Sequence, residues 1–205
     1  MNFLNSKPEV EKKEKLVTKP SYEEAEEAVR TLLRWAGDDP SREGLLDTPS
    51  RVVRAYSEWF AGYNEDPEKI LERTFEEVAG YSEIVTLKDI RFESYCEHHL
   101  APIIGIVHVA YIPTERVVGI SKIARLVDAF SKRLQVQEKM TSQIANTLQS
   151  VLKPLGTAVL VEGDHHCMCT RGVHKTTSTM ISSAFTGDFK KKQELKNEFY
   201  KIVGK

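Results

Sequence analysis

Two short windows rich in cysteine and histidine most constrain how this chain can fold. Cys96-Glu97-His98-His99 forms the first window, and His165-His166-Cys167 follows about seventy residues later. All three cysteines and four of the six histidines lie in or directly beside these windows. Cysteine and histidine are the side chains that zinc prefers at neutral pH. We therefore expect a fold that brings both windows to one metal ion.

The spacing within the windows indicates which residues bind the metal. Cys96 and His99 are three apart and can both reach one ion from a short turn, whereas His98 would point elsewhere. Cys167 can supply a third ligand if its segment is extended, and His165 would then project from the same face. Three protein ligands with an open position for water favour a catalytic site over a structural one.

Cys169 leaves two interpretations open. It lies two residues after Cys167 and could be a fourth ligand, or it could be a spare buried thiol. The second interpretation is preferred.

Composition limits the classes of function. The chain has 205 residues, 40% of them hydrophobic and 29% charged, with a net charge of −1. This balance gives no general electrostatic reason to expect binding to nucleic acid or to an anionic membrane. The start of the chain lacks a basic, then apolar, secretory signal, and no apolar run is long enough to span a bilayer. With thiols expected to be reduced, we predict a cytoplasmic protein.

Three regions are expected along the chain. Residues 1–19 are polar and lysine-rich and indicate a flexible arm. Residues 20–80 form a helical region, and residues 81–205 form the catalytic domain. In the helical region, Ser21 and Glu24 make a capping box for one helix, and Thr48-Pro49 starts another. The aromatic residues of the second helix, Tyr56, Trp59 and Phe60, are expected in the core.

The pattern of the third region predicts an α+β fold. Period-two segments near 84–92, 103–112, 157–162 and 176–181 predict four strands, with a bulge near Lys88-Asp89 in the first. Two helices lie between the second and third strands, one capped by Ser121 and one following Leu134-Gln135. We expect an antiparallel four-stranded sheet covered on one face by these helices. Its two exposed edges predict a homo-oligomer.

At this point the residues resemble the GTP cyclohydrolase I family, from about Ser21 to Phe189. The motifs that carry the resemblance are Arg42-Glu43-Gly44-Leu45-Leu46-Asp47-Thr48-Pro49-Ser50-Arg51, Cys96-Glu97-His98-His99, Ala110-Tyr111-Ile112-Pro113, Gly119-Ile120-Ser121-Lys122, Gln135-Val136-Gln137-Glu138, and His165-His166-Cys167 with Arg171-Gly172. The resemblance implies the tunnelling fold and conversion of GTP and water to 7,8-dihydroneopterin triphosphate and formate, the first step of pterin and tetrahydrofolate biosynthesis. It also implies a toroidal homodecamer with sites between subunits.

The resemblance assigns roles residue by residue. Cys96, His99 and Cys167 match the Zn²⁺ ligands, and His98 and His165 match the histidines that transfer protons. An imidazole suits that role because its pKa lies near neutral pH. Ser121 matches the hydroxyl that assists rearrangement of the ribose. It is also interpreted as a helix cap, and both can hold.

Substrate-binding roles follow in the same way. Gln137 and Glu138 match the residues that read guanine, although a first-turn acid such as Glu138 also suits a helix N-terminus. A triphosphate clamp is implied at four basic residues, each of which taken alone is typical of a solvated surface. They are Arg51, Lys122, Arg125 and Arg171. No Gly-x-x-x-x-Gly-Lys loop occurs to hold phosphates instead.

The chain departs from the usual family pattern at three positions, which are Leu134 (often proline), His166 and Cys169.

Two other functions compete with the enzyme. A zinc-stabilised binding module would need neither His98 nor His165, and a nitrile reductase on the same fold would need an NADPH-binding motif that is not evident. A zinc deaminase is excluded because its His-x-Glu and Pro-Cys-x-x-Cys signature is missing.

Overall fold

The computed structural model describes residues 18–75 and 81–205, in two compact units that divide between Arg54 and Ala55. The predicted arm of residues 1–19 lies almost entirely outside the described residues. The division into regions 20–80 and 81–205 stays a prediction. Within the described ranges, no helix is both long and apolar enough to cross a membrane.

The first unit is helical. It contains α1 (Tyr22–Trp35), the short 3-10 helix η1 (Glu43–Leu45) and the start of α2 (Thr48–Trp59). The predicted capping box is confirmed, because the Glu24 N–H donates to the Ser21 hydroxyl at 3.2 Å and the Ser21 N–H donates to the Glu24 carboxylate at 2.8 Å. No residue of α1 is buried, and its Trp35 is 88% exposed.

The aromatic residues at the end of α2 belong to the second unit. The prediction that they are core residues is wrong for Tyr56 and Trp59, which are 39% and 41% exposed. They pack instead as a partly exposed ring cluster with Phe60 and Tyr95, in which the Trp59 and Tyr95 rings stack with centroids 5.1 Å apart. Helical spacing indicates which face is apolar, but not how completely that face is covered.

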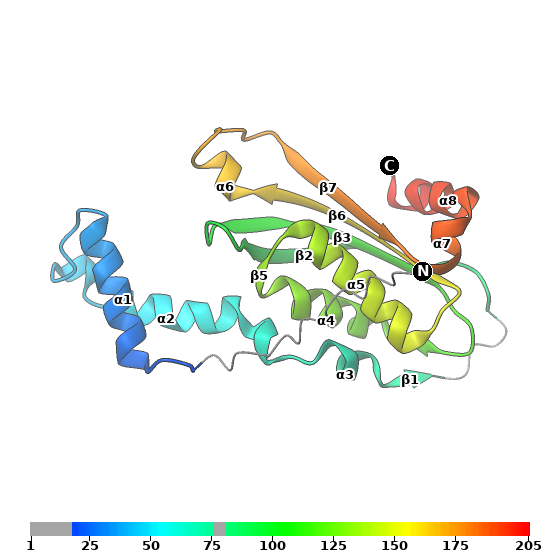
Figure 1. Ribbon diagram of the computed structural model, residues 1–205, viewed down its shortest axis with the longest axis horizontal. Coiled ribbons are helices and arrows are strands. Elements are labelled where there is room, and N and C mark those ends of the chain that lie inside the picture. Colours follow the sequence, from blue (N-terminus) through cyan, green and yellow to red (C-terminus); the bar gives the residue numbers. More distant parts are fainter. Residues whose placement is uncertain (1–17, 76–80) are drawn as a thin grey trace, which may run out of the picture. The chain divides into compact units, whose positions relative to one another are not determined.

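A five-stranded mixed sheet organises the second unit (Figure 1). The strand order is β5-β2-β3-β6-β7. The predicted antiparallel ladder is confirmed for the four longer strands, which are β2 (Val85–Cys96), β3 (Pro102–Ile112), β6 (Gly156–His165) and β7 (Thr179–Phe185). The expectation of only four strands is wrong, because β5 (Leu134–Gln135) adds a short parallel edge beside the end of β2. The predicted bulge is confirmed by a register shift between Leu87 and Ile90.

A second, two-stranded sheet pairs β1 (Thr74–Phe75) with β4 (Val117–Val118). β7 also lies later in the chain than expected, since residues 176–178 still belong to the turn that precedes it.

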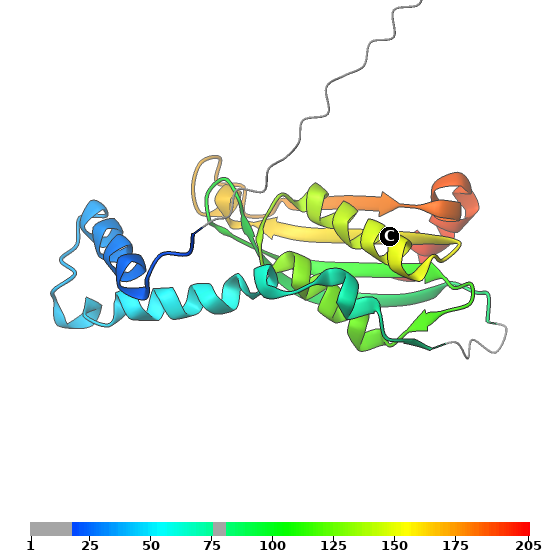
Figure 2. The ribbon, with the colours of Figure 1, turned by 60° about the horizontal axis from the view of Figure 1, so that its bottom comes forward.

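Two helices cover one face of the main sheet, as predicted: α4 (Ile120–Ser131) packs against β2, and α5 (Gln137–Leu152) packs against β6 and β7 (Figure 2). α3 (Pro67–Leu71) packs on α4 and α5, and the core that these elements enclose includes Phe92, Val107, Leu126, Ile144 and Val161. Ser121 is not the cap of α4, which corrects the prediction. The helix begins at Ile120, and Gly119, two residues before Ser121, occupies the N-cap. No side chain caps the helix. Ser121 is exposed in the first turn.

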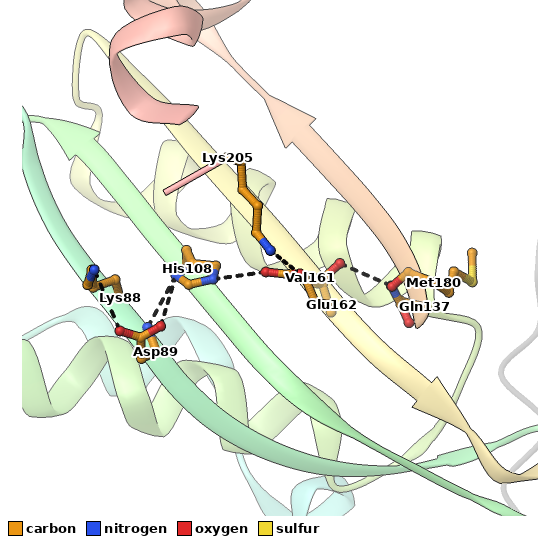
Figure 3. A network of polar contacts seen from close by, with 8 residues as sticks. All are labelled: Lys88, Asp89, His108, Gln137, Val161, Glu162, Met180 and Lys205. Atoms are coloured by element: carbon orange, nitrogen blue, oxygen red, sulfur yellow. Dashed lines mark hydrogen bonds and ion pairs between the residues drawn. The ribbon is translucent and has the colours of Figure 1, made fainter. Parts of the chain in front are cut away.

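The opposite face carries a smaller core that the sequence analysis did not anticipate. α7 (Gly187–Lys191) and α8 (Gln193–Val203) bury Phe189 and Phe199 against alternate residues of β3 and β6. A polar network crosses the same face (Figure 3). His108 is 1% exposed, its Nδ1 accepts the Asp89 N–H at 3.2 Å, and its Nε2 lies 3.4 Å from Glu162. These contacts among Asp89, His108 and Glu162 are part of the fold.

Candidate active site

The first Cys/His window forms a tight turn at the end of β2. The carbonyl of Cys96 accepts the N–H groups of His99 and Leu100 at 3.3 and 2.9 Å, and Leu100 has a positive φ of 54°. This turn brings the Cys96 sulfur to 3.9 Å from His99 Nδ1. Cys96 is buried, whereas His99 is exposed, so the pair presents a soft ligand set at the protein surface.

The second window reaches the same point through the sheet register. Ile103 of β3 pairs with Ser94 of β2 on one side and with His165 of β6 on the other. The last residues of β2 and β6 therefore lie at the same end of the sheet, on either side of β3. The chain then turns into α6 (His166–Cys169). The expectation of an extended segment through Cys167 is therefore wrong, and His165 instead ends the strand as the residue before this helical turn.

Cys96, His99 and Cys167 nonetheless form one group. Their potential ligand atoms all lie within 4.8 Å of one another. Zinc bonds of about 2.1 Å to nitrogen and 2.3 Å to sulfur would place tetrahedral ligand atoms roughly 3.5–3.8 Å apart, so the group needs little adjustment. Burial and the hydrogen bond to the Cys96 sulfur raise the pKa of the Cys167 thiol. A bound cation would favour the thiolate form of both cysteines.

Cys169 is outside this group. Its sulfur donates to the Lys175 carbonyl at 3.4 Å, within the turn that follows α6. Among the described residues, the three-donor group does not include it, which supports the interpretation as a spare thiol.

His98 and Arg171 flank the group. His98 is exposed, and its Nδ1 lies 3.8 Å from the Cys96 sulfur, so it remains beside the metal-binding position rather than turning away. Arg171 Nη1 lies 3.3 Å from His99 Nε2, so the positive charge of Arg171 lies beside the metal-binding group.

His165 is half-buried and lies two residues before Cys167. Burial lowers its pKa, and the negative charges of Glu138 and Asp164 offset part of this shift. Its Nε2 is 2.9 Å from the side-chain oxygen of Gln137, the first residue of α5. The neighbouring Glu138 is exposed. Two predicted guanine readers and a predicted proton-transfer histidine therefore lie together.

Three other predicted residues lie elsewhere. Ser121, Lys122 and Arg125 occupy the first turns of α4, whose opposite end precedes β5 beside Cys96. At 1.5 Å per residue, a helix of this length separates its ends by about 18 Å. Lys122 and Arg125 line a cavity of about 730 Å³ with residues of α3 and of the 3-10 helix η2 (Ala61–Asn64), and none of the three metal-binding residues lines it.

Arg51 belongs to the first unit. It is exposed and pairs with Asp47 at 3.2 Å, four residues earlier on α2.

Comparison with known proteins decides the family. The family model described as GTP cyclohydrolase I matches residues 25–204. The chain belongs to the GTP cyclohydrolase I family. The GTP cyclohydrolase 1 of Maricaulis maris (strain MCS10) is 60% identical over 186 residues, which cover 91% of each chain. The GTP cyclohydrolase 1 of Hyphomonas neptunium (strain ATCC 15444) is 58% identical over 188 residues, which cover 92% of this chain and 91% of that protein.

Among solved structures, the archaeosine synthase QueF-Like in the apo form matches with a TM-score of 0.42 and 22% identity, over 51% of this chain and 93% of that chain.

For a member of the GTP cyclohydrolase I family, the sequence analysis missed one set of residues beside the site. Gly163 and Ser182 lie against the Gln137 side-chain amide, and Thr141 donates to the Gln137 backbone carbonyl. A glycine within a strand is a signal for close approach of another group, but it does not reveal which group approaches.

Proposed function

We propose that this protein is a zinc-dependent GTP cyclohydrolase I that hydrolyses GTP at C8 and yields formate and 7,8-dihydroneopterin triphosphate. The observation that carries the proposal is the group formed by Cys96, His99 and Cys167, with His98 beside the Cys96 sulfur and His165 two residues before Cys167. A binding module would need the metal group alone. Family membership and about 60% identity to curated members support turnover of GTP.

The proposed mechanism divides the work between the metal and the histidines. Zinc held by Cys96, His99 and Cys167 would supply a bound water with a pKa near 7, which suits attack on the unreactive C8 of guanine. His165 and His98 would transfer protons to and from the ring nitrogens as the imidazole ring opens and formate leaves. Ser121 would assist the ribose rearrangement that precedes ring closure.

Recognition of GTP would use both ends of the substrate. The exposed carboxylate of Glu138 can accept hydrogen bonds from guanine N1 and the exocyclic amine, an edge that adenine does not offer. Gln137 is the residue beside it, at the start of α5. Arg171 at the rim, with Lys122, Arg125 and Arg51, would hold the triphosphate by charge-assisted hydrogen bonds.

We further propose that each site forms between subunits of a toroidal homodecamer built from the tunnelling fold. Two observations support this assembly. The basic residues of α4 line a cavity that none of the metal-binding residues shares, so a second chain is needed to bring the two halves together. The chain also leaves apolar side chains uncovered, including Trp35, and within residues 18–75 and 81–205 the strand β7 pairs only with β6.

The compartment we propose is the cytoplasm. All three cysteines are free thiols, as is usual in a reducing compartment.

Incubation of the purified protein with GTP tests the function. We expect formate together with a pterin that becomes fluorescent on oxidation. Binding of GTP without formate would support the binding module, and NADPH oxidation with a nitrile substrate would support the reductase.

A further inference from the structure

We infer that Gln137 is a positioning residue that holds His165 in the tautomer protonated at Nε2, leaving Nδ1 as the ring nitrogen that accepts a proton. This inference rests on the proposed function for its catalytic meaning. Its structural content, the tautomer of one histidine, can be measured without turnover.

The nitrogen side of the Gln137 amide is fixed by groups that can only accept hydrogen bonds. Its Nε2 lies 3.2 Å from the Val161 carbonyl and 3.0 Å from the Met180 carbonyl, on the neighbouring strands β6 and β7 (Figure 3). Backbone carbonyls do not donate. An amide turned the other way would place its oxygen against two carbonyl oxygens, so the nitrogen must face the strands.

Two hydroxyl groups strengthen this orientation. Thr141 donates to the Gln137 backbone carbonyl at 2.7 Å, which leaves its oxygen free to accept from Ser182 at 2.7 Å. The Ser182 oxygen can then accept from Gln137 Nε2, which lies 3.1 Å away. In this series of hydrogen bonds, Gln137 donates to Ser182, Ser182 donates to Thr141, and Thr141 donates to the Gln137 carbonyl. This order requires the Gln137 nitrogen to face the strands, as the two carbonyls also do.

The oxygen side of the amide then determines the state of His165. Gln137 Oε1 lies 2.9 Å from His165 Nε2. An amide oxygen only accepts, so Nε2 must carry a proton. In a neutral imidazole the other nitrogen, Nδ1, is then the acceptor.

Gly163 provides independent support. A Cβ atom at this position would lie 2.6 Å from Gln137 Oε1 and 3.1 Å from the nearest Ile103 side-chain atom. Gly163 also lies on β6 two residues before His165 and faces α5 with it. The absence of a side chain at this point gives the amide oxygen its place against the imidazole.

The same contacts narrow the role of Gln137 in guanine recognition. Gln137 is 1% exposed, and both polar atoms of its side chain are engaged within the chain. We assign its side chain to His165 and leave the guanine edge to the exposed Glu138.

The test compares Gln137→Met with Gln149→Met in the zinc-loaded, full-length protein. Methionine keeps the length of the side chain and removes the amide. Gln149 is a matched control on the same helix, since its partly buried amide also bonds within the chain, to Pro154 and Thr186, but not to a histidine. For Gln137→Met we expect full zinc content, a KM for GTP within about threefold of wild type, and kcat lower by about 10- to 100-fold, as for other groups that orient an active-site histidine. Gln149→Met should keep wild-type kcat.

Solid-state ¹⁵N NMR of protein labelled on histidine gives the second readout. At alkaline pH, where imidazoles are neutral, His165 should show protonated Nε2 in the wild type and a mixture of tautomers in Gln137→Met. Its signal is assigned by difference from His165→Gln. Gly163→Ala keeps the amide but displaces its oxygen, and should reproduce both the loss of kcat and the mixed tautomer.

Three results would overturn the inference. They are a wild-type His165 protonated at Nδ1, a Gln137→Met protein with unchanged kcat and tautomer, and a Gln137→Met protein whose defect is entirely in KM. A wild-type protein that shows the expected tautomer but releases no formate from GTP would instead refute the proposed function and leave the structural assignment standing.

Discussion

Cys167 and Cys169 differ by two positions in the chain, yet only Cys167 lies within reach of Cys96 and His99. Cys167→Ser should therefore lose zinc and activity together, since three ligands are the minimum set seen in catalytic zinc sites. Cys169→Ser should keep both, because its thiol donates to the Lys175 carbonyl and lies outside the three-donor group of the described residues. Metal analysis of the two purified variants is the measurement. Full zinc occupancy in Cys167→Ser, or zinc loss in Cys169→Ser, would show that the ligand set is misassigned.

Glu138 is the other residue whose role a single substitution can isolate. Glu138→Gln replaces a carboxylate that accepts two hydrogen bonds with an amide that can only partly do so. An unpaired polar group in a desolvated site costs about 1–3 kcal/mol, so GTP binding should weaken by roughly tenfold or more.

Inosine triphosphate, which lacks the exocyclic amine, should be affected less, and the preference for GTP over it should shrink. Equilibrium binding of both nucleotides measures this ratio. Glu198→Gln, an exposed acid on α8, is the control. If the preference is unaltered, Glu138 acts as a first-turn helix acid and not as a guanine reader.

At the scale of helices and strands, local signals predicted elements of both units. The capping box of α1, the bulge in β2 and the four long strands follow from patterns that act within a few residues. The two Cys/His windows also predicted their own meeting, because no other arrangement explains their composition.

Elements that depend on distant contacts were not predictable in this way. β5 is two residues long and exists only through its pairing with β2. α6 is a single helical turn, so its four residues carry no periodicity. The place of the Gln137 amide depends on two strands and on Gly163, which are remote in sequence. The separation of Ser121 from the metal group depends on the length of α4, which no motif records.

The close packing of η2 against the end of α4 predicts how a substitution at Gly62 changes stability. A Cβ atom on Gly62 would lie 2.5 Å from the Ala129 carbonyl and 2.8 Å from the Lys132 carbonyl. Gly62→Ala should therefore force the two elements apart and lower the free energy of unfolding by about 1–3 kcal/mol. Denaturant unfolding is the measurement. Gly44→Ala is the control, since its only close neighbour is the flexible end of Arg42. Equal stability of both variants would contradict the close packing described.

For the whole molecule, sites shared between subunits predict complementation. The Cys96→Ala protein has lost a metal ligand, and the Arg125→Ala protein has lost part of the phosphate clamp. An oligomer made of either variant alone should be inactive or nearly so. In mixed oligomers refolded from equal amounts, a site that draws its two halves from different chains should be intact in about a quarter of cases. Formate release should recover accordingly.

Cys96→Ala mixed with Cys167→Ser is the matched control. Both substitutions break the metal group of the same chain, so no site can be restored. An absence of recovery for Cys96→Ala with Arg125→Ala, in oligomers shown by mass spectrometry to be mixed, would place the whole site within one chain.

We propose that the Cys96, His99 and Cys167 group enables this chain to release C8 of GTP as formate. The most direct measurement follows GTP labelled with ¹³C at C8 by NMR, in zinc-loaded protein, in protein stripped by a chelator, and after zinc is returned. We expect one labelled formate for each GTP consumed, no turnover in the stripped protein, and recovery with zinc. Label that stays in the purine or pterin product, or formate release that persists without metal, would contradict the claim.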